Sequence, residues 1–553
     1  MQTLAYNILA KIKDEAVSHI FVVPGKNIIP FLSAIDQLDE YVCGVVCATE
    51  LGAGFMADGY SRVTRNFGTV ITISGPGFSN LYGALVNAYY DNSKLLILCG
   101  TPKTEFSGKN SFQDASLYKL DCSVVAADLC SYSCNLNTCS VQNQLRNSFF
   151  NLKNYNLPVF VQISVDIQVE STDIHIDAKV VDKRFLNYSA LSFIENLILS
   201  KKAFLFVTGR SAVKYSAAIK KFCEKYYIPA ASTLCSKGVI PENKDYYLGI
   251  FGFGMSPRTF AILNTADFEY IIAIGLDLTE RNTSRWTAYR GKNIIHLDQI
   301  VSENSRDYEG VANAYLTDVT LLLEALENNS AVITKLKESV SARKKLLSDI
   351  INCVPYTIPI EHSCDKTLYV DQVLKFLNTA FYKNTNVVVD SGLHRLYCAH
   401  LWRTYDSNAY FTSINNAHMG WAIAACIGIK LGDSKKDCIC ITGDGCMLMN
   451  GTEIQTAAKY NIRVFFIVLN NNAHGAMSCE NLNKNNFVIP DHDWVSFGRS
   501  LGVESLCVNN IPELQAACNI YMASEGPVLI NVKCGYDENI FLNKYYTHLQ
   551  ENV

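Results

Sequence analysis

A glycine-flanked aspartate and an asparagine pair are the residues best placed in this sequence to hold a metal ion and a phosphate. Asp444 follows the apolar run DCICITG, and Asn471 follows the next one, RVFFIVLN, with a helix-like segment between them. A right-handed strand-helix-strand unit brings the carboxyl ends of two parallel strands together, so both side chains are expected at one edge of a sheet. The pattern predicts two converging oxygen ligands.

A carboxylate and an amide oxygen suit Mg²⁺, which keeps part of its water shell and takes further oxygens from a bound phosphate. Gly443 and Gly445 would let the backbone approach such a phosphate, and the helix that begins there offers unpaired N–H groups. A diphosphate is therefore the expected partner. A Gly-Asp-Gly turn alone is common by chance, but its spacing to Asn471 makes the pair more specific.

The elements that must position this pair alternate between strand-like runs and amphipathic stretches, which predicts an α/β protein with parallel sheets covered on both faces. A polar stretch after residue 168 and a Pro-bearing stretch before residue 365 resemble linkers, so three doubly wound domains are expected at 1–170, 189–330 and 365–553. The expected strands are 19–23, 41–47, 68–74, 94–100, 158–168, 203–209, 270–278, 293–298, 386–391, 437–443, 463–470 and 527–533.

Length and composition exclude several classes of protein. The chain has 553 residues, enough for more than one large core, and a formal net charge of -4 without charged blocks, which argues against nucleic-acid binding. Its 20 cysteines form no CxxC pair, which argues against a zinc site. The opening MQTLAYNILAKIKDEA resembles an amphipathic helix and no run reaches the length of a membrane span, so a cytoplasmic protein is predicted.

In this order the motifs resemble the thiamine-diphosphate-dependent enzymes, and the acetolactate synthase branch in particular. The resemblance covers nearly the whole chain. It is carried by VVPGKNIIPF (22–31), similar to a loop facing the substrate, CATELGAGFMADGYSR (47–62), similar to the segment of the catalytic glutamate, and then ISGPGFSNLYGAL (73–85), NSFQDAS (110–116), DSGLHRLYCAH, TSINNAHMGWAIAACIGIKL and GPVLINVKCGYDENIF.

The resemblance implies that Glu50 is catalytic, that Gln113 is an active-site hydrogen-bonding group and that Lys26 faces the substrate. An acid beside the cofactor's aminopyrimidine ring promotes its imino tautomer, and desolvation after an apolar strand would raise the pKa of Glu50. Taken alone, Glu50 fits a helix N-terminal charge, Gln113 a loop amide and Lys26 a solvated lysine. The cofactor-binding residues implied are Glu50, Gly75, Asn80, Gly392, Leu393, His394, Ala417, Met419, Gly443, Asp444, Gly445, Cys446, Asn471, Ala473, His474 and Gly475, with Asp444, Asn471 and Ala473 as metal ligands.

Three of these residues have specific roles in the family pattern. Met419 would be the apolar wedge between the two cofactor rings, with the Ala417 carbonyl beside the amino group and His394 reaching the diphosphate. The family commonly has glycine where this chain has Ala417. Met419 also fits an ordinary core residue and His394 a surface histidine.

Departures from the simple pyruvate decarboxylases bear on the reaction. Asp114 and Ala115 follow Gln113 where those enzymes carry a histidine pair, and Met477 stands where they carry a glutamate. Without these proton donors, the acyl-anion equivalent of a 2-keto acid such as pyruvate is expected to attack an acceptor carbonyl. Two alternatives stay open: a non-ligating decarboxylase or lyase, and a catalytically retired thiamine-diphosphate-binding subunit.

The resemblance also bears on flavin and on assembly. Flavin-containing acetolactate synthases hold FAD in the middle domain, whose glycine-rich start is reduced here to VTGRSAV (207–213). The glycines of GIFGFGMSPR (249–258) could still leave room for a nucleotide, so FAD binding stays an open alternative. In the family the cofactor lies between the first domain of one chain and the third of another, which implies a homodimer or homotetramer.

Overall fold

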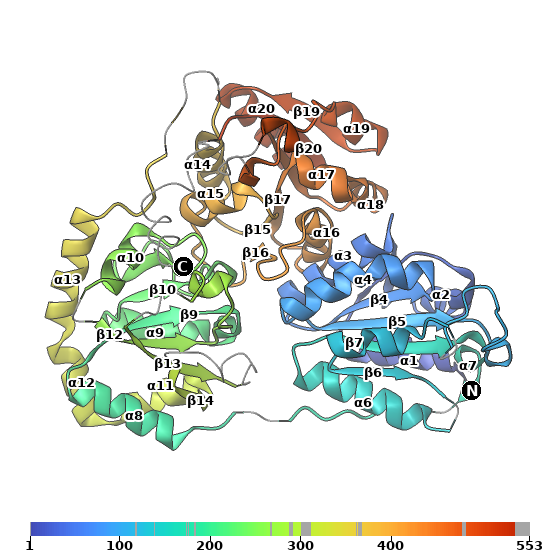
Figure 1. Ribbon diagram of the computed structural model, residues 1–553, viewed down its shortest axis with the longest axis horizontal. Coiled ribbons are helices and arrows are strands. Elements are labelled where there is room, and N and C mark those ends of the chain that lie inside the picture. Colours follow the sequence, from blue (N-terminus) through green and yellow to red (C-terminus); the bar gives the residue numbers. More distant parts are fainter. Residues whose placement is uncertain are drawn as a thin grey trace.

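The computed structural model describes residues 2–116, 119–137, 139–172, 174, 176–181, 184–265, 268–286, 291–299, 311–360, 362, 368–477 and 483–536. They form three domains, each built on a six-stranded parallel sheet covered by helices on both faces (Figure 1). In Figure 1 the N-terminal domain (blue to teal) and the central domain (green) lie side by side, and the C-terminal domain (orange to red) lies across their junction. The predicted α/β class with three doubly wound sheets is confirmed.

The N-terminal sheet has the strand order β3-β2-β4-β5-β7-β6. Its strands are β2 (His19–Val22), β3 (Cys43–Val46), β4 (Gly68–Ile73), β5 (Leu95–Thr101), β6 (Tyr132–Asn135) and β7 (Val159–Ser164). Its helices are α1 (Leu4–Asp14), α2 (Ile29–Gln37), α3 (Glu50–Thr64), α4 (Pro76–Tyr90), α5 (Cys122–Ala126), α6 (Val141–Asn154) and α7 (Val165–Gln168). A short antiparallel pair, β1 (Gln2–Thr3) with β8 (Ser171–Thr172), closes the domain.

The central sheet has the order β11-β10-β9-β12-β13-β14. Its strands are β9 (Ala203–Thr208), β10 (Ala230–Ser232), β11 (Tyr247–Ile250), β12 (Phe268–Ile274), β13 (Asn293–Asp298) and β14 (Val311–Leu316). Its helices are α8 (Tyr188–Leu199), α9 (Ser216–Tyr226), α10 (Pro257–Leu263), α11 (Val319–Asn328), α12 (Ser330–Glu338) and α13 (Val340–Cys353). The last two lie in the stretch expected as a connector. They pack on the central core through the buried Val332, Leu336, Leu347 and Ile350, because their apolar residues recur at helical spacing.

The C-terminal sheet has the order β16-β15-β17-β18-β20-β19. Its strands are β15 (Thr385–Val389), β16 (Tyr410–Thr412), β17 (Asp437–Gly443), β18 (Phe465–Asn470), β19 (Glu504–Val508) and β20 (Val528–Lys533). Its helices are α14 (Val370–Phe381), α15 (Leu393–Leu401), α16 (Trp421–Gly432), α17 (Asp444–Asn450), α18 (Ile454–Lys459), α19 (Trp494–Ser500) and α20 (Ile511–Ala523). The part of the expected domain beyond residue 536 lies outside the described residues.

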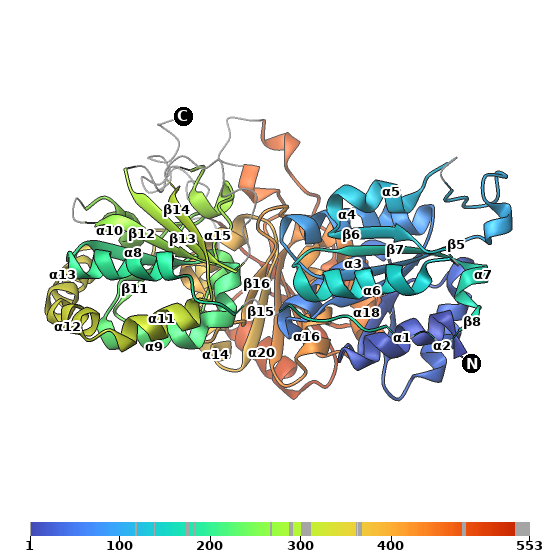
Figure 2. The same ribbon diagram turned by 90° about the horizontal axis from the view of Figure 1, so that it is seen from below.

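Helices α3 and α16 join the N-terminal and C-terminal domains by direct backbone contact (Figures 1 and 2). A Cβ atom on Gly59 would lie 2.1 Å from the Ala425 carbonyl oxygen, and one on Gly428 would lie 1.8 Å from the Met56 carbonyl oxygen. Arg62 of α3 also donates to the Thr412 carbonyl of the C-terminal domain at 3.0 Å. The two domains of one chain are therefore closely packed along α3.

Among the described helices, none combines the length and the apolar character that a bilayer crossing demands. The cytoplasmic location stays a prediction from the sequence.

Candidate functional site

Asp444 and Asn471 lie at the same edge of the C-terminal sheet. Strands β17 and β18 pair with Gly443 opposite Leu469, Asp444 is the first residue of α17, and Asn471 directly follows β18. A cavity of about 540 Å³ opens at this edge, and both residues line it. The strand-helix-strand unit thus brings the two oxygen-bearing side chains to one cavity.

The Asp444 carboxylate has the character of a cation ligand. Its Oδ1 accepts a hydrogen bond of 2.9 Å from the Gly445 N–H, while its buried Oδ2 has no hydrogen-bond partner among the described residues. Burial raises the pKa of Asp444, and the N–H groups of Gly445, Asn472 and Ala473 oppose that rise. A buried carboxylate oxygen without a donor is costly unless a cation binds it. The residues present therefore fit Mg²⁺.

Glycines at this edge bring the backbone to the cavity surface. A Cβ atom on Gly445 would lie 2.8 Å from the His474 ring and 3.2 Å from the terminal carbon of Met419. One on Gly443 would lie 3.4 Å from the His394 ring. Any side chain at these positions would occupy the space beside Asp444, so glycine keeps the edge open for a phosphate group.

His394 is buried and electrically neutral beside the same edge. Burial lowers its pKa to about 3, and the nearby Arg395 adds to the effect. Its Nε2 atom is buried and has no hydrogen-bond partner among the described residues. The Asp390 carbonyl accepts from the imidazole, so in the neutral ring Nε2 carries a lone pair and pairs with a phosphate oxygen only where that oxygen or the ring is protonated.

All of the third-domain residues that the resemblance assigns to the cofactor line this one cavity. They are Gly392, Leu393, His394, Ala417, Met419, Gly443, Asp444, Gly445, Cys446, Asn471, Ala473, His474 and Gly475. Met477, which stands where the simple decarboxylases carry a glutamate, also lines this cavity. Their places in the cavity are structural facts, and their roles stay predictions.

The central domain contributes a wall of the cavity that the sequence reasoning missed. Phe253, Arg281 and Arg285 line it, and the Arg281 guanidinium lies 5.1 Å from the centre of the Phe253 ring. The available signals were the glycine-rich run around Phe253 and two arginines close together in a loop after β12. Spacing within one domain does not reveal which loops of another domain close over a site.

The wedge segment is held by an aspartate that the sequence reasoning also missed. Asp390 Oδ1 accepts from the Gly420 N–H at 3.0 Å, and its Oδ2 accepts from the Thr442 hydroxyl at 2.9 Å. Ala417, in the same segment, has a φ of 54°, a conformation that glycine adopts more easily. This explains why glycine is common there in the family. Met419 lies between Ala417 and Gly420 in the sequence, and its side chain lines the cavity.

The predicted residues of the N-terminal domain form a second cluster, at the carboxyl edge of their own sheet. The Asn80 amide donates to Glu50 Oε2 at 3.1 Å, and the Asn27 amide donates to Gln113 Oε1 at 3.2 Å. A Cβ atom on Gly75 would lie 3.5 Å from the Gln113 side chain. Lys26, next to Asn27, is exposed.

This second cluster does not line the C-terminal cavity within the chain. Glu453 of the C-terminal domain fixes the start of α3. Its Oε1 accepts from the N–H of Thr49, the residue before α3, at 2.9 Å and from the Thr49 hydroxyl at 2.7 Å. The chain thus contains two half-sites, one around Glu50 and one around Asp444, and does not join them.

The central sheet does not fit a flavin nucleotide at its switch point between β9 and β12. Nucleotide diphosphates bind there on free backbone N–H groups. The Gly209 N–H is bonded to Ile274, the Ser211 N–H to Gly275 and the Ala212 N–H to Gly209.

Acidic side chains at the same place add to this misfit. The Asp277 carboxylate accepts from the Asn415 amide at 2.9 Å, and Asp91 lies 3.8 Å from Arg210. Arg210 is thus shared between Asp91 and Asp277, and Arg62 is taken up by Asp91 at 2.8 Å, so these cations are not free to bind a diphosphate.

Comparison with known families matches each domain separately. Residues 2–120 match the N-terminal TPP binding domain of thiamine pyrophosphate enzymes, residues 191–326 match their central domain, and residues 390–532 match their C-terminal TPP binding domain. Each match falls within one of the three domains; the first ends before β6 and β7, and the last begins just after β15.

Several curated proteins align with nearly the whole chain. The acetolactate synthase large subunit of Pyropia yezoensis is 24% identical over 563 residues, covering 98% of this chain and 93% of that protein. The acetolactate synthase isozyme 2 large subunit of Escherichia coli (strain K12) is 23% identical, with 97% and 96% covered. The acetolactate synthase of Bacillus subtilis (strain 168) is 24% identical, with 96% and 92% covered.

Proposed function

Since the chain belongs to the thiamine-diphosphate-dependent enzymes and is acetolactate synthase-like, we propose that it decarboxylates a 2-keto acid, pyruvate by preference, and joins the remaining acyl unit to an acceptor carbonyl. The observation that carries this proposal is the buried Asp444 oxygen without a donor, beside Asn471 on a glycine-lined cavity edge. Alignment with acetolactate synthases along the whole chain supports ligation over the alternatives.

Thiamine diphosphate, when bound, supplies a carbon acid whose anion adds to the keto acid and accepts the electron pair released with CO₂. We infer that Asp444, Asn471 and the Ala473 carbonyl hold Mg²⁺, which in turn orients the diphosphate. Buried His394 would lie beside the diphosphate, where its Nε2 would accept a hydrogen bond from a protonated phosphate oxygen. Met419 supplies an apolar surface against the ring system.

Glu50 is the proposed proton-transfer group for the aminopyrimidine nitrogen. In a single chain it lies with Asn80 and Gln113 in the half-site that is separate from the cavity. We therefore propose a homo-oligomer in which Glu50 of a second copy completes the cavity. Closure by a second domain would exclude water from the cavity.

Exposed apolar side chains near both half-sites support this assembly. Leu448 and Met449 on α17 are each 52% exposed, Tyr82 on α4 is 37% exposed, and Phe112 beside Gln113 is 82% exposed. Large apolar side chains gathered around a polar site are typical of a surface that another protein covers. A second copy would bury them.

Ligation is favoured over aldehyde release by what lines the cavity. Met477 offers no proton where the simple decarboxylases carry a glutamate. The acidic side chains that line the cavity among the described residues are Asp444, the proposed metal ligand, and Glu280, which lies 3.5 Å from Arg285. The described lining holds no further acidic side chain, and Glu50 of the second copy is assigned to the aminopyrimidine nitrogen, so the acyl unit is expected to await an acceptor carbonyl.

The test is turnover of pyruvate with thiamine diphosphate and Mg²⁺, with CO₂ and acetolactate both quantified. We expect acetolactate from the wild type and a loss of about 100-fold or more in kcat for Glu50→Gln, because general acid-base catalysis contributes that much. Lys202→Gln, on the exposed surface of the central domain, is the control and should retain activity.

Other outcomes separate the alternatives. Free aldehyde without acetolactate would indicate a non-ligating decarboxylase. Cofactor binding without CO₂ release from any of a panel of 2-keto acids would indicate a retired subunit. Full activity of Glu50→Gln would show that Glu50 takes no part in the reaction.

A further inference from the structure

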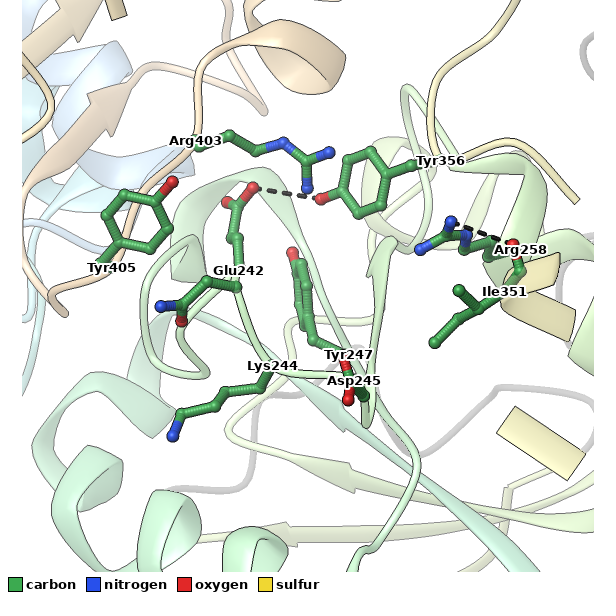
Figure 3. Close-up of a pocket in the computed structure, with 10 residues that line it drawn as sticks. Glu242, Lys244, Asp245, Tyr247, Arg258, Ile351, Tyr356, Arg403 and Tyr405 are labelled. Atoms are coloured by element: carbon green, nitrogen blue, oxygen red, sulfur yellow. Dashed lines mark hydrogen bonds between the residues drawn. The ribbon is translucent and has the colours of Figure 1, made fainter. Parts of the chain in front are cut away.

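A second cavity lies at the seam between the central and C-terminal domains, and Figure 3 shows its lining. Its volume is about 380 Å³, within the range of small-molecule sites. Glu242 and Arg258 come from the central domain, Tyr356 follows α13, and Arg403 and Tyr405 follow α15. None of these residues lines the cofactor cavity.

Both lysines next to this second cavity are paired with glutamates. Buried Lys237 lies 2.6 Å from Glu242, and Lys244 lies 2.5 Å from Glu224. Asp245 accepts a hydrogen bond of 3.4 Å from the Tyr227 hydroxyl.

The two guanidinium groups of the cavity have no carboxylate within ion-pair distance among the described residues. Arg258 donates through Nε to the Val354 carbonyl at 3.0 Å and through Nη2 to the Ile351 carbonyl at 3.3 Å, and the more distant Asp245 carboxylate offsets part of its charge. Burial lowers the pKa of Arg258, and repulsion from Arg403 lowers it further. The cavity therefore carries an excess of positive charge.

Arg403 is the cation best placed to bind a ligand. Its guanidinium carbon lies 3.3 Å from the centre of the Tyr356 ring, and the Tyr356 hydroxyl donates to Glu242 Oε2 at 3.1 Å, which fixes that ring. Figure 3 shows the Arg403 guanidinium over Tyr356, with the Tyr405 hydroxyl on the same side of the cavity. Neither the Arg403 guanidinium nor the Tyr405 hydroxyl has a hydrogen-bond partner in the described part of the chain.

We propose that this cavity binds the carboxylate or phosphate group of a small organic molecule, with Arg403 as its main ligand and the Tyr405 hydroxyl as a second donor. A guanidinium held flat by an aromatic ring keeps its N–H edge in place and pairs with two oxygens of one anion. The remaining volume, lined by tyrosine rings, accommodates a small organic body rather than a free ion alone.

Binding is tested on the enzyme saturated with thiamine diphosphate and Mg²⁺, so that the cofactor cavity does not take up the probe. Inorganic phosphate and succinate are titrated separately by calorimetry against chloride at equal ionic strength. We expect saturable binding of at least one probe by the wild type. Arg403→Gln should weaken it by about tenfold or more, since a charged donor is lost, and Tyr405→Phe should weaken it several-fold. Lys202→Gln, far from the cavity in the central domain, should bind as the wild type does.

The two probes distinguish the sources of the oxyanion: binding of phosphate alone assigns a phosphoryl ligand, and binding of succinate alone assigns a carboxylate ligand. Tyr405→Phe removes a single oxygen, so it keeps the test valid if Arg403→Gln unfolds. Absence of saturable binding of both probes, or equal affinity in the wild type, Arg403→Gln and Tyr405→Phe, would overturn the proposal.

Discussion

At the scale of single residues, the buried Asp390 makes the stability of the protein depend on pH. Burial raises its pKa to about 6, although the N–H groups and the hydroxyl around it oppose the shift. Its pKa is near 3.9 in an unfolded chain, so the fold favours the protonated form. The stability gained is fully present below about pH 4 and is lost as pH rises through about 6, a difference of about 3 kcal/mol.

Asp390→Asn should therefore remove this pH dependence. The amide keeps the size of the carboxyl group and cannot ionise, so the variant should gain stability relative to the wild type between pH 4 and pH 7. The measurement is the urea midpoint of both proteins across this range. Asp433→Asn, a partly exposed carboxylate of the same domain, is the control and should track the wild type. A constant difference between Asp390→Asn and the wild type would contradict the pKa shift.

The residues of the cavity differ in how far the sequence alone could identify them. Asp444 and Asn471 followed from the order of elements, because a strand-helix-strand unit determines where its loops meet. Asp390 and Phe253 could not be found this way. One acts through hydrogen bonds to other loops, and the other arrives from a different domain.

At the scale of elements, strand prediction depended on burial. Each expected strand coincides with or overlaps a strand of the structure, because central parallel strands are continuous apolar runs. In the three domain sheets the strands not expected were β6, β10, β11, β14, β16 and β19, and all but the short β10 lie at sheet edges; the separate two-stranded pair of β1 and β8 was not expected either. Edge strands are covered on fewer sides and carry more polar residues, so their pattern resembles that of loops.

The crossing of α3 and α16 leads to a prediction at this scale. Gly428→Ala would place a methyl group 1.8 Å from the Met56 carbonyl oxygen, so the helices must separate. We expect a loss of about 2–3 kcal/mol or more in stability, seen as a lower urea midpoint.

Gly83→Ala on α4 is the matched control for this helix crossing. There the nearest atom to the new methyl group is the flexible end of Leu51, at 3.2 Å. The variant should be as stable as the wild type or slightly more stable, because alanine favours a helix over glycine. Equal midpoints for Gly428→Ala and the wild type would show that the crossing tolerates separation.

At the scale of the whole molecule, the separation of the two half-sites explains why assembly could be inferred only from the family. Each domain folds around its own sheet. The sequence pattern of a domain does not indicate whether its cavity is covered by the N-terminal domain of the same chain or by that of another copy. Within one chain, Glu453 fixes the start of α3 through hydrogen bonds to Thr49, and Glu50 does not line the cavity around Asp444. If both clusters serve one active site, as proposed, that site requires a second copy of the chain.

Mixing two inactive variants tests this geometry directly. If each active site takes Glu50 from one chain and Asp444 from another, a hybrid of Glu50→Gln and Asp444→Asn has one intact site and one doubly altered site. Random exchange of subunits after mild unfolding and refolding should then restore about a quarter of the wild-type activity, because about half of the dimers are hybrids with one of two sites intact. If both residues served a site within the same chain, every chain would keep one defect and no activity would return. Refolded samples of each variant alone measure the background, so the recovery in the mixture reports only how the two half-sites are shared.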